Sequence, residues 1–301
     1  MNILITGGSG FIGSHLIESL LSKGHSITNL TTQENLPNTG SIRNVYWNAH
    51  AGKSNLDLNE NFDGVIHLAG FSVSNKWNKK NKALMVSSRL ESTTFLVELL
   101  EKMKTKPQWF IGASAVGYYA DSNAWLTEES EKGTGFLAEL TDAWEKAAIP
   151  IEELGVRSSH IRIGIVLSHR DGALKKMYPL FKYRIGSVIG NGEQFMSWIH
   201  INDLIRQFIF VAEHEEIRGK INGTAPMPVN NREFSKTFAT VLGKRQLTPP
   251  IPAFALKMLI GEMSTLVLMS QKCSSQKIES YGFKFQFDNL TNALKDIYGK
   301  A

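Results

Sequence analysis

The sequence predicts an α/β protein with a Rossmann-type, doubly wound parallel sheet and a small, discontinuous C-terminal cap domain. Two observations support this fold class. Short apolar runs alternate with long helical patterns through the first half of the chain, which is typical of right-handed βαβ units. In addition, a glycine-rich turn at residues 6–13 follows the first apolar run and precedes the first helical pattern.

The predicted strands and helices follow from this alternation. Apolar, β-rich runs predict strands at residues 3–6, 26–30, 45–47, 64–68, 109–114 and 159–167. Helical periodicity predicts helices at residues 11–22, 82–104 and 133–154. After Leu167 glycines and prolines become frequent. We therefore predict an NAD(P)-binding Rossmann domain made of residues 1–167 plus 197–224, and a small substrate or cap domain made of residues 168–196 plus 225–301.

The composition limits the classes of partner. The formal net charge of +5 is small and the basic residues are scattered, so we expect a small-molecule substrate and no nucleic acid. The single cysteine, Cys273, excludes an intramolecular disulfide, and no cluster of His, Asp, Glu or Cys has metal-ligand spacing. The apolar stretch 253–269 is broken by Lys257 and Glu262, so we expect no membrane span. No signal peptide is visible, and we expect a cytoplasmic protein.

The opening glycines have the spacing of a dinucleotide-phosphate loop. Gly7, Gly10 and Gly13 lie between a predicted strand and a predicted helix, which is the context that this fingerprint requires. Gly7 would permit the tight turn, Gly10 would let a pyrophosphate approach the backbone, and Gly13 would let the helix pack closely on the strand. The helix amino terminus would supply free N–H donors and partial positive charge. A glycine-rich turn without a ligand is the alternative.

The end of the second strand favours NADP over NAD, although NAD stays possible. An acidic residue at this place would bind the ribose 2′-hydroxyl of NAD and repel a 2′-phosphate. Here the chain reads Leu30-Thr31-Thr32-Gln33, with no acid before Glu34. No arginine stands there either, but Arg43 on the next strand could supply positive charge if the fold brings it near.

Motifs along almost the whole chain resemble one family. They are similar to the extended short-chain dehydrogenase/reductases of the NAD(P)-dependent epimerase/dehydratase superfamily. The closer resemblance is to the atypical "epimerase family" branch, also labelled sugar-nucleotide epimerase-like or cell-division-inhibitor-like. The motifs are TGGSGFIG at 6–13, HLAG at 67–70, SSR at 87–89, SAVGYY at 114–119, FLAELTDAWE at 136–145, RIGIVL at 162–167, MSWIHINDL at 196–204, NGTAPMPV at 222–229, PPIPAFALKMLIGEMS at 249–264 and YGFKF at 281–285.

The resemblance implies a set of cofactor-binding residues and one catalytic position. The cofactor set comprises the loop residues Gly7, Ser9, Gly10, Phe11, Ile12 and Gly13, then Thr31 and Thr32 beside the adenosine ribose, Leu68, Ala69 and Gly70 beneath the riboses, and Arg89 near the cleft. For Arg89, anion binding and a structural ion pair are equal alternatives. Ser114 would lie near the nicotinamide as a catalytic residue, although the family pattern can also be aligned with Ala115 at that position.

The proton-transfer pair of this superfamily is missing. A catalytic tyrosine needs a lysine four residues later, because the positive charge lowers the high pKa of a phenol. On the helix predicted after Ser114, these two places fall on Leu137 and Thr141. Tyr118 and Tyr119 are the phenols nearest to Ser114 along the chain, and strand alternation would let at most one of them face the cofactor. One of them could act as an acid, or both could fill the seam between the domains.

Three further residues are candidates for substrate contact. Trp77 stands in a loop rich in lysine and could border a pocket for an anionic substrate, or simply belong to a solvated basic loop. Arg162 lies in an apolar strand, where it could bind an anion or form a structural ion pair. His200 could contact substrate, or bond to loop carbonyls or to Asp203.

Two hypotheses of function follow. The first is an NADP-binding oxidoreductase or epimerase-like enzyme that acts on a small, nucleotide-linked or other, substrate without the Tyr-x-x-x-Lys pair. The second is a non-catalytic NADP(H)-binding sensor or regulatory protein. The missing pair favours the second hypothesis, whereas the cap domain and the polar strand ends favour the first. The sequence carries no prediction of the oligomeric state.

Overall fold

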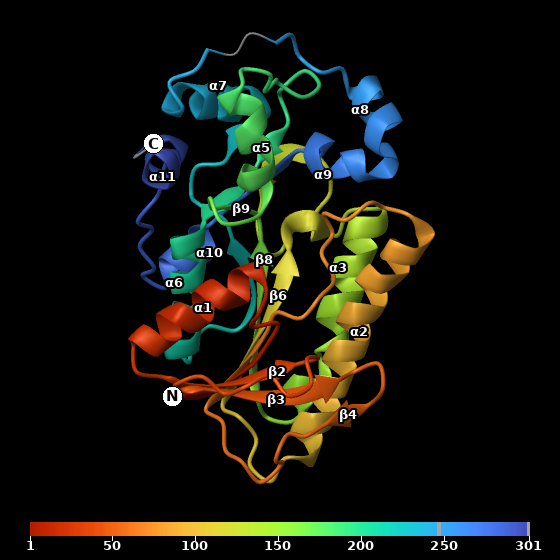
Figure 1. Ribbon diagram of the computed structural model, residues 1–301, viewed down its shortest axis with the longest axis vertical. Helices are drawn as coiled ribbons and strands as arrows, with labels where there is room; N and C mark the ends of the chain where they lie inside the picture. Colours follow the sequence, from red (N-terminus) through yellow and green to blue (C-terminus); the bar gives the residue numbers. More distant parts are fainter. Residues whose placement is uncertain (246–247, 300–301) are drawn as a thin grey trace. The chain divides into compact units, whose positions relative to one another are not determined.

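The chain forms a large α/β sheet flanked by helices, as the computed structural model shows for residues 1–245 and 248–299 (Figure 1). The sheet has eight strands in the order β12-β8-β6-β5-β1-β2-β3-β4. These strands are β1 (Asn2–Thr6), β2 (Ser26–Thr31), β3 (Ile42–Asn48), β4 (Lys53–Ser54), β5 (Gly64–His67), β6 (Trp109–Ala115), β8 (Arg157–Ile163) and β12 (Gly219–Gly223). The pairs β1–β2, β1–β5, β2–β3 and β5–β6 are parallel, and β4 is antiparallel to β3. This is the strand order of a doubly wound Rossmann sheet, so the predicted fold class is confirmed.

The chain divides into two compact units whose segments interleave. Unit 1 comprises Met1–Ser114, Glu139–Ile161 and Ile205–Lys220, and unit 2 comprises Ala115–Ala138, Arg162–Leu204 and the chain from Ile221 onward. The chain therefore passes from one unit to the other five times. These bounds differ from those of the predicted domains at 115–138, 162–167, 197–204 and 221–224, which all lie in unit 2.

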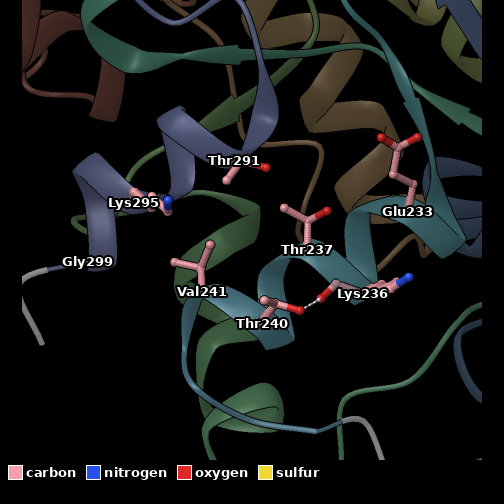
Figure 2. A pocket seen from close by; sticks show the side chains of 8 residues that line it. All are labelled: Glu233, Lys236, Thr237, Thr240, Val241, Thr291, Lys295 and Gly299. Carbon is pink, nitrogen blue, oxygen red and sulfur yellow. Dashed lines mark hydrogen bonds between the residues drawn. The ribbon is translucent and has the colours of Figure 1, made fainter.

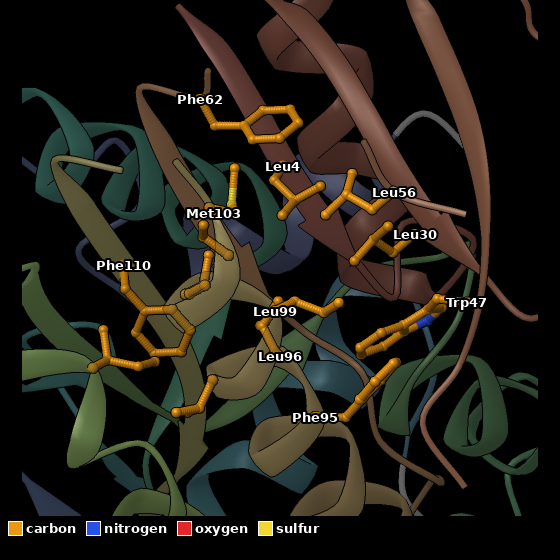
Figure 3. Packing of buried hydrophobic residues seen from close by; sticks show 14 of the residues in the cluster. Leu4, Leu30, Trp47, Leu56, Phe62, Phe95, Leu96, Leu99, Met103 and Phe110 are labelled. Carbon is orange, nitrogen blue, oxygen red and sulfur yellow. The ribbon is translucent and has the colours of Figure 1, made fainter. Parts of the chain in front are cut away.

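Unit 1 contains most of the sheet and its covering helices. The helices are α1 (Phe11–Ser22), α2 (Lys79–Lys102), α3 (Phe136–Ala147, from Glu139 on), α4 (Pro150–Glu153) and α6 (Ile201–Glu213, from Ile205 on). Figure 3 shows part of the core, in which Leu4 and Leu30 of the strands lie with Phe95, Leu96 and other residues of α2. Burial of these apolar side chains fixes α2 against the sheet.

Unit 2 consists of small sheets and short helices. Its elements are η1 (Val116–Tyr118), β7 (Ser122–Leu126), β9 (Ile165–Leu167), α5 (Ala173–Lys182), β10 (Phe195–Met196), β11 (Trp198–His200), β13 (Val229–Asn230), α7 (Asn231–Val241), α8 (Ala253–Ile260), η2 (Gly261–Ser264), α9 (Thr265–Leu268), β14 (Gln271–Cys273), α10 (Gln276–Ser280) and α11 (Leu290–Tyr298). β9 pairs with β11, β7 with β14 and β10 with β13. Its core is built around Trp198, Phe234 and Phe238.

Two predicted elements are each divided in the structure. The strand expected at 159–167 is two strands, β8 and β9, separated by Gly164. A Cβ atom on Gly164 would lie 2.3 Å from the Ser197 carbonyl oxygen, so the strand change requires glycine. The helix expected at 133–154 is α3 followed by α4, which begins at Pro150, a residue that cannot continue a preceding helix. Within residues 1–245 and 248–299, no helix is both long and apolar enough to cross a membrane.

Candidate functional site

The glycine-rich turn between β1 and α1 is closed by backbone contacts. Gly7 has a φ of +72°, and a Cβ atom there would lie 2.8 Å from the carbonyl carbon of Leu68. On Gly13 a Cβ atom would lie 2.3 Å from the Gly7 carbonyl oxygen. The Gly10 amide donates to that same oxygen at 3.0 Å. The predicted glycines are therefore required by the way the loop packs against the chain that leaves β5.

The amino terminus of α1 is suited to an anion. Gly10 is the N-cap residue, no side chain caps the helix, and no acidic residue lies in its first turn. Because the first amides of a helix have no intrahelical acceptor, they present free donors and partial positive charge. Ser9 and Gly10 are exposed, whereas Phe11 and Ile12 are half-buried and Gly13 is buried. A Cβ atom on Gly10 would meet only the Gly7 carbonyl oxygen, at 3.1 Å, so the loop leaves room for a group to approach the backbone.

A buried hydrogen-bond chain lies beneath this loop. The Thr6 hydroxyl oxygen accepts from the amides of Leu68 and Ala69, each at 3.2 Å, and lies 2.7 Å from His67 Nδ1. His67 Nε2 lies 3.0 Å from the Thr93 hydroxyl, which donates to the Arg89 carbonyl oxygen. Since the Thr93 proton is used there, His67 must donate from Nε2 and accept at Nδ1. These hydrogen bonds hold the backbone of Leu68 and Ala69, two predicted cofactor residues, through a neutral imidazole with a fixed tautomer.

The unfolding free energy should depend on the protonation of His67. Burial lowers the pKa of His67 from 6.5 to about 3. The folded state therefore keeps a neutral imidazole, whereas the unfolded chain binds a proton below pH 6.5. The stabilisation is complete above that pH and is lost as the pH falls toward 3, with a limiting slope of about 1.4 kcal/mol per pH unit. Urea unfolding of wild type and His67→Gln should give parallel curves above pH 7 and a steeper fall for wild type below it; equal slopes at acidic pH would contradict this.

The end of β2 lacks an acidic side chain, as the sequence predicts. Thr31 is buried and its hydroxyl accepts from the Gln33 amide at 3.2 Å, whereas Thr32 is exposed. Arg43 is not near this place. It is paired in register with Thr28, three residues before Thr31, and its guanidinium bonds to Glu60. The expectation that Arg43 could supply charge at the end of β2 is wrong, because its side chain is held toward the amino-terminal half of the strand.

Arg89 supports the chain that follows β5. Its Nη1 donates to the carbonyl oxygens of Phe71 at 2.8 Å and Met85 at 3.1 Å, and its guanidinium lies 4.7 Å from the Trp144 ring centroid. A Cβ atom on Gly70 would lie 3.0 Å from the Arg89 guanidinium carbon. Burial lowers the pKa of Arg89 to about 10, so it stays cationic at neutral pH. Cofactor contact by Arg89 stays a prediction, and these contacts describe a role in bonding backbone carbonyls.

Ser114 is paired with a carboxylate that is not among the predicted site residues. The Ser114 hydroxyl, near the carboxyl end of β6, donates to Glu145 Oε1 on α3 at 2.5 Å. Ser114 is 3% exposed and Glu145 is 7% exposed. Glu145 stands on the helix where the superfamily tyrosine and lysine are expected, eight and four residues after Leu137 and Thr141. The sequence signal that could have identified Glu145 is the presence of an acidic residue on the buried face of this helix.

Comparison with known proteins identifies the family. The family described as "NAD dependent epimerase/dehydratase family" matches residues 3–149, and a "Domain of unknown function (DUF1731)" matches residues 251–297. An epimerase family protein of Staphylococcus aureus (strain MRSA252) is 37% identical over 299 residues, which are 99% of each chain. This chain belongs to the NAD-dependent epimerase/dehydratase family. The resemblance inferred from the motifs, and a nicotinamide dinucleotide as the cofactor class, are thereby confirmed.

Two solved structures are similar to this chain over its whole length. The human epimerase family protein SDR39U1 (isoform 2), solved with NADPH, has a TM-score of 0.90 and 30% identity and matches 100% of both chains. A nucleoside-diphosphate sugar epimerase from Corynebacterium glutamicum has a TM-score of 0.79 and 31% identity. This chain is covered completely in that match but spans only 58% of the longer protein.

Three of the predicted residues of this epimerase-family chain form a structural network in unit 2. Tyr118 ends the turn η1 and Tyr119 follows it, so the expected strand alternation is wrong. The Tyr119 hydroxyl donates to Asn222 Oδ1 at 2.7 Å, and burial raises the pKa of this phenol well above its usual range. The Arg162 guanidinium lies 3.6 Å from the Tyr118 ring centroid and donates to the Glu128 carbonyl oxygen. Both Tyr119 and Arg162 are fully buried, so these contacts favour the structural alternative for them.

Trp77 and His200 are also held by the protein. Trp77 Nε1 donates to the Val73 carbonyl oxygen at 2.9 Å, and Lys82 lies over its ring. His200 is 2% exposed; its Nδ1 accepts from the Asn202 amide and its ring packs 3.9 Å from that of Phe287. Burial lowers the pKa of His200 despite Asp296 nearby. Substrate contact by either residue stays a prediction, and these contacts favour a structural role.

A pocket of about 710 Å³ lies apart from the predicted site residues, between α7 and α11 of unit 2 (Figure 2). Its lining residues are Glu233, Lys236, Thr237, Thr240, Val241, Thr291, Lys295 and Gly299. None of them belongs to the predicted cofactor, catalytic or substrate set. Throughout the described part of the chain, no group of three His, Cys, Asp or Glu side chains is placed to hold a metal ion.

Proposed function

We propose that this protein is an NADP(H)-dependent oxidoreductase or epimerase-like enzyme that acts on a small hydroxyl- or carbonyl-bearing substrate. The observation that carries the proposal is the uncapped amino terminus of α1 behind the Gly7–Gly10–Gly13 loop. These amides would hold the pyrophosphate, Thr31 and Thr32 would lie beside the adenosine ribose, and Leu68 and Ala69 would lie beneath the riboses. The bound nicotinamide would supply a two-electron donor or acceptor.

NADP(H), which carries a 2′-phosphate that NAD(H) lacks, is proposed because of the residues at the end of β2. The end of β2 carries two threonines and no carboxylate that would repel a phosphate. The human relative of TM-score 0.90 is solved with NADPH. A nucleotide-linked sugar is one candidate substrate class, since the relative from Corynebacterium glutamicum is described as a nucleoside-diphosphate sugar epimerase.

NADPH should bind at least about tenfold more tightly than NADH, as measured by calorimetry. The variant Thr32→Asp places a carboxylate at the exposed end of β2, where it would repel the 2′-phosphate and could bond to a free 2′-hydroxyl. It should weaken NADPH binding and leave NADH binding unchanged or tighter. Tighter binding of NADH by wild type would contradict the NADP(H) preference, and no binding of any nicotinamide dinucleotide would contradict the function as a whole.

A non-catalytic NADP(H) sensor is the second candidate, because the Tyr-x-x-x-Lys pair is missing from α3. The two candidates differ in turnover. The protein should be incubated with NADPH and a panel of sugar nucleotides, ketones and quinones while the absorbance of NADPH is followed. Oxidation by any member at a rate above that of the protein-free mixture supports the enzyme, whereas binding without oxidation across the panel supports the sensor.

A further inference from the structure

Ser114 can act toward a substrate only as a hydrogen-bond acceptor while its pairing with Glu145 lasts. A serine hydroxyl has one proton, and this one is directed to Glu145 Oε1 at 2.5 Å. The lone pairs of the oxygen are then the part of the group that can meet another molecule. A substrate hydroxyl, which has a proton to donate, matches this requirement. A bare carbonyl oxygen does not.

An ionised Glu145 carboxylate would be the acceptor for the Ser114 proton. Hydroxyl-to-carboxylate bonds of about 2.5–2.7 Å are typical of the charge-assisted class. Glu145 and Ser114 are both nearly inaccessible to solvent, so the carboxylate depends on protein donors such as Ser114. Three other titratable side chains stand on the neighbouring elements. They are His67 on β5, whose pKa burial lowers to about 3, His160 on β8, and Arg89, which stacks on Trp144 of α3.

The position in the sheet connects this pair with the proposed cofactor. The strand order changes direction between β1 and β5, and ligands of doubly wound sheets bind at the carboxyl ends of the strands beside such a point. The phosphate loop follows β1 and the residues proposed to lie beside the adenosine ribose follow β2, so the nicotinamide half would extend toward β5 and β6. Ser114 is near the carboxyl end of β6.

We propose that Ser114 and Glu145 form the proton-transfer pair that replaces the missing tyrosine and lysine, with Ser114 as the catalytic residue and Glu145 as the positioning residue behind it. This inference rests on the proposed function. In the oxidising direction the substrate O–H bond breaks and its proton goes to Ser114 Oγ, while the proton of Ser114 goes to Glu145. The substrate C–H bond breaks with its electron pair and the substrate becomes a carbonyl compound. The bound oxidised nicotinamide would supply the acceptor for this hydride. Reduction reverses each transfer and starts from a protonated Glu145, which gives its proton to Ser114 while Ser114 donates its own proton to the carbonyl oxygen.

The test compares the binding of NADP⁺ and NADPH and needs no substrate. The oxidised nicotinamide ring carries a positive charge that the reduced ring lacks, so an ionised Glu145 near it should favour NADP⁺. Glu145→Gln keeps the shape and an acceptor oxygen for Ser114 but removes the charge. We expect it to raise the Kd of NADP⁺ about three- to tenfold and to leave the Kd of NADPH within about twofold. Glu139→Gln, at an exposed position of α3, is the control and should change neither Kd.

The pH dependence of the NADP⁺/NADPH affinity ratio tests whether Glu145 can take up a proton, as the proposed transfer requires. The difference between wild type and Glu145→Gln in the NADP⁺/NADPH ratio should shrink as the pH falls, because protonation removes the charge that the variant already lacks. If Glu145→Gln does not fold, Glu145→Asp should shift the ratio in the same direction by a smaller factor, since it withdraws the charge by one methylene. Equal loss for both cofactors, or an unchanged ratio in a folded variant, overturns the inference but not the proposed function. Failure of wild type to bind either cofactor overturns both.

Discussion

Replacing Gly13 by alanine should abolish measurable NADPH binding and lower the free energy of unfolding by about 3 kcal/mol. The added methyl group would lie 2.3 Å from the Gly7 carbonyl oxygen and 2.8 Å from the Gly8 Cα, both of which are backbone atoms. Neither can rotate away, so the loop and the first turn of α1 must separate. The amides that are proposed to hold the pyrophosphate would move with them. Urea unfolding and calorimetry with NADPH measure the two effects.

Gly10→Ala provides the matched comparison for Gly13→Ala. Its methyl group would lie 3.1 Å from the Gly7 carbonyl oxygen and meet nothing else, so folding should change by less than about 1 kcal/mol. It would nevertheless occupy the place where a diphosphate must approach, and NADPH affinity should fall at least about tenfold. Ser22→Ala, at the exposed end of the same helix, should change neither quantity. If Gly13→Ala binds NADPH like wild type, the loop is not the phosphate site.

Replacing Arg157 by methionine should lower the free energy of unfolding by about 3–5 kcal/mol. The Arg157 side chain is buried, and its Nη1 donates to the carbonyl oxygens of Val211 at 3.0 Å and Ile217 at 2.9 Å. Its Nη2 donates to the Ala212 carbonyl oxygen at 3.2 Å. Two of these carbonyls belong to the last turn of α6, whose carbonyl groups have no intrahelical donor. Methionine fills a similar volume but leaves all three carbonyls without this partner.

Two further variants make the Arg157 experiment specific. Arg157→Lys keeps the charge but has one nitrogen instead of a planar fork, so we expect an intermediate loss in urea unfolding. Arg218→Met removes the same charge from an exposed position and should cost less than about 1 kcal/mol. A loss in Arg157→Met no greater than that in Arg218→Met would show that the carbonyl cluster does not depend on the guanidinium.

The elements nearest to the phosphate loop could be predicted from the sequence because local signals determine them. The helix predicted at 11–22 is α1 to the residue, since the glycine turn fixes its start and its apolar face fixes its extent. The division of the strand at Gly164 could not be predicted in this way. Its cause is the close approach of the Ser197 carbonyl, which is distant in the sequence. Neither glycine alone nor the apolar run around it reveals such a contact.

The same limit applies to the polar residues. Ser114 is a candidate because of its place at a strand end, but its partner Glu145 lies 31 residues later, on a helix where the family pattern points to tyrosine and lysine positions instead. Tyr119 and Asn222, 103 residues apart, both lie within motifs that suggest function, yet they bond to each other inside unit 2. A sequence motif does not distinguish residues that the fold needs from residues that a reaction needs, because both give the same signal. Only the buried contacts separate the two.

The interleaved course of the chain has a consequence for dissection of the protein. Because the polypeptide enters each unit three times, no single cut yields a fragment that consists of one complete unit alone. A fragment that ends after Ser114 would lack the α3 carboxylate and the Arg157 strand, and would expose apolar surface to aggregation. Limited proteolysis should accordingly release no stable half-molecule, and dissection of this protein will have to rely on point substitutions rather than truncations.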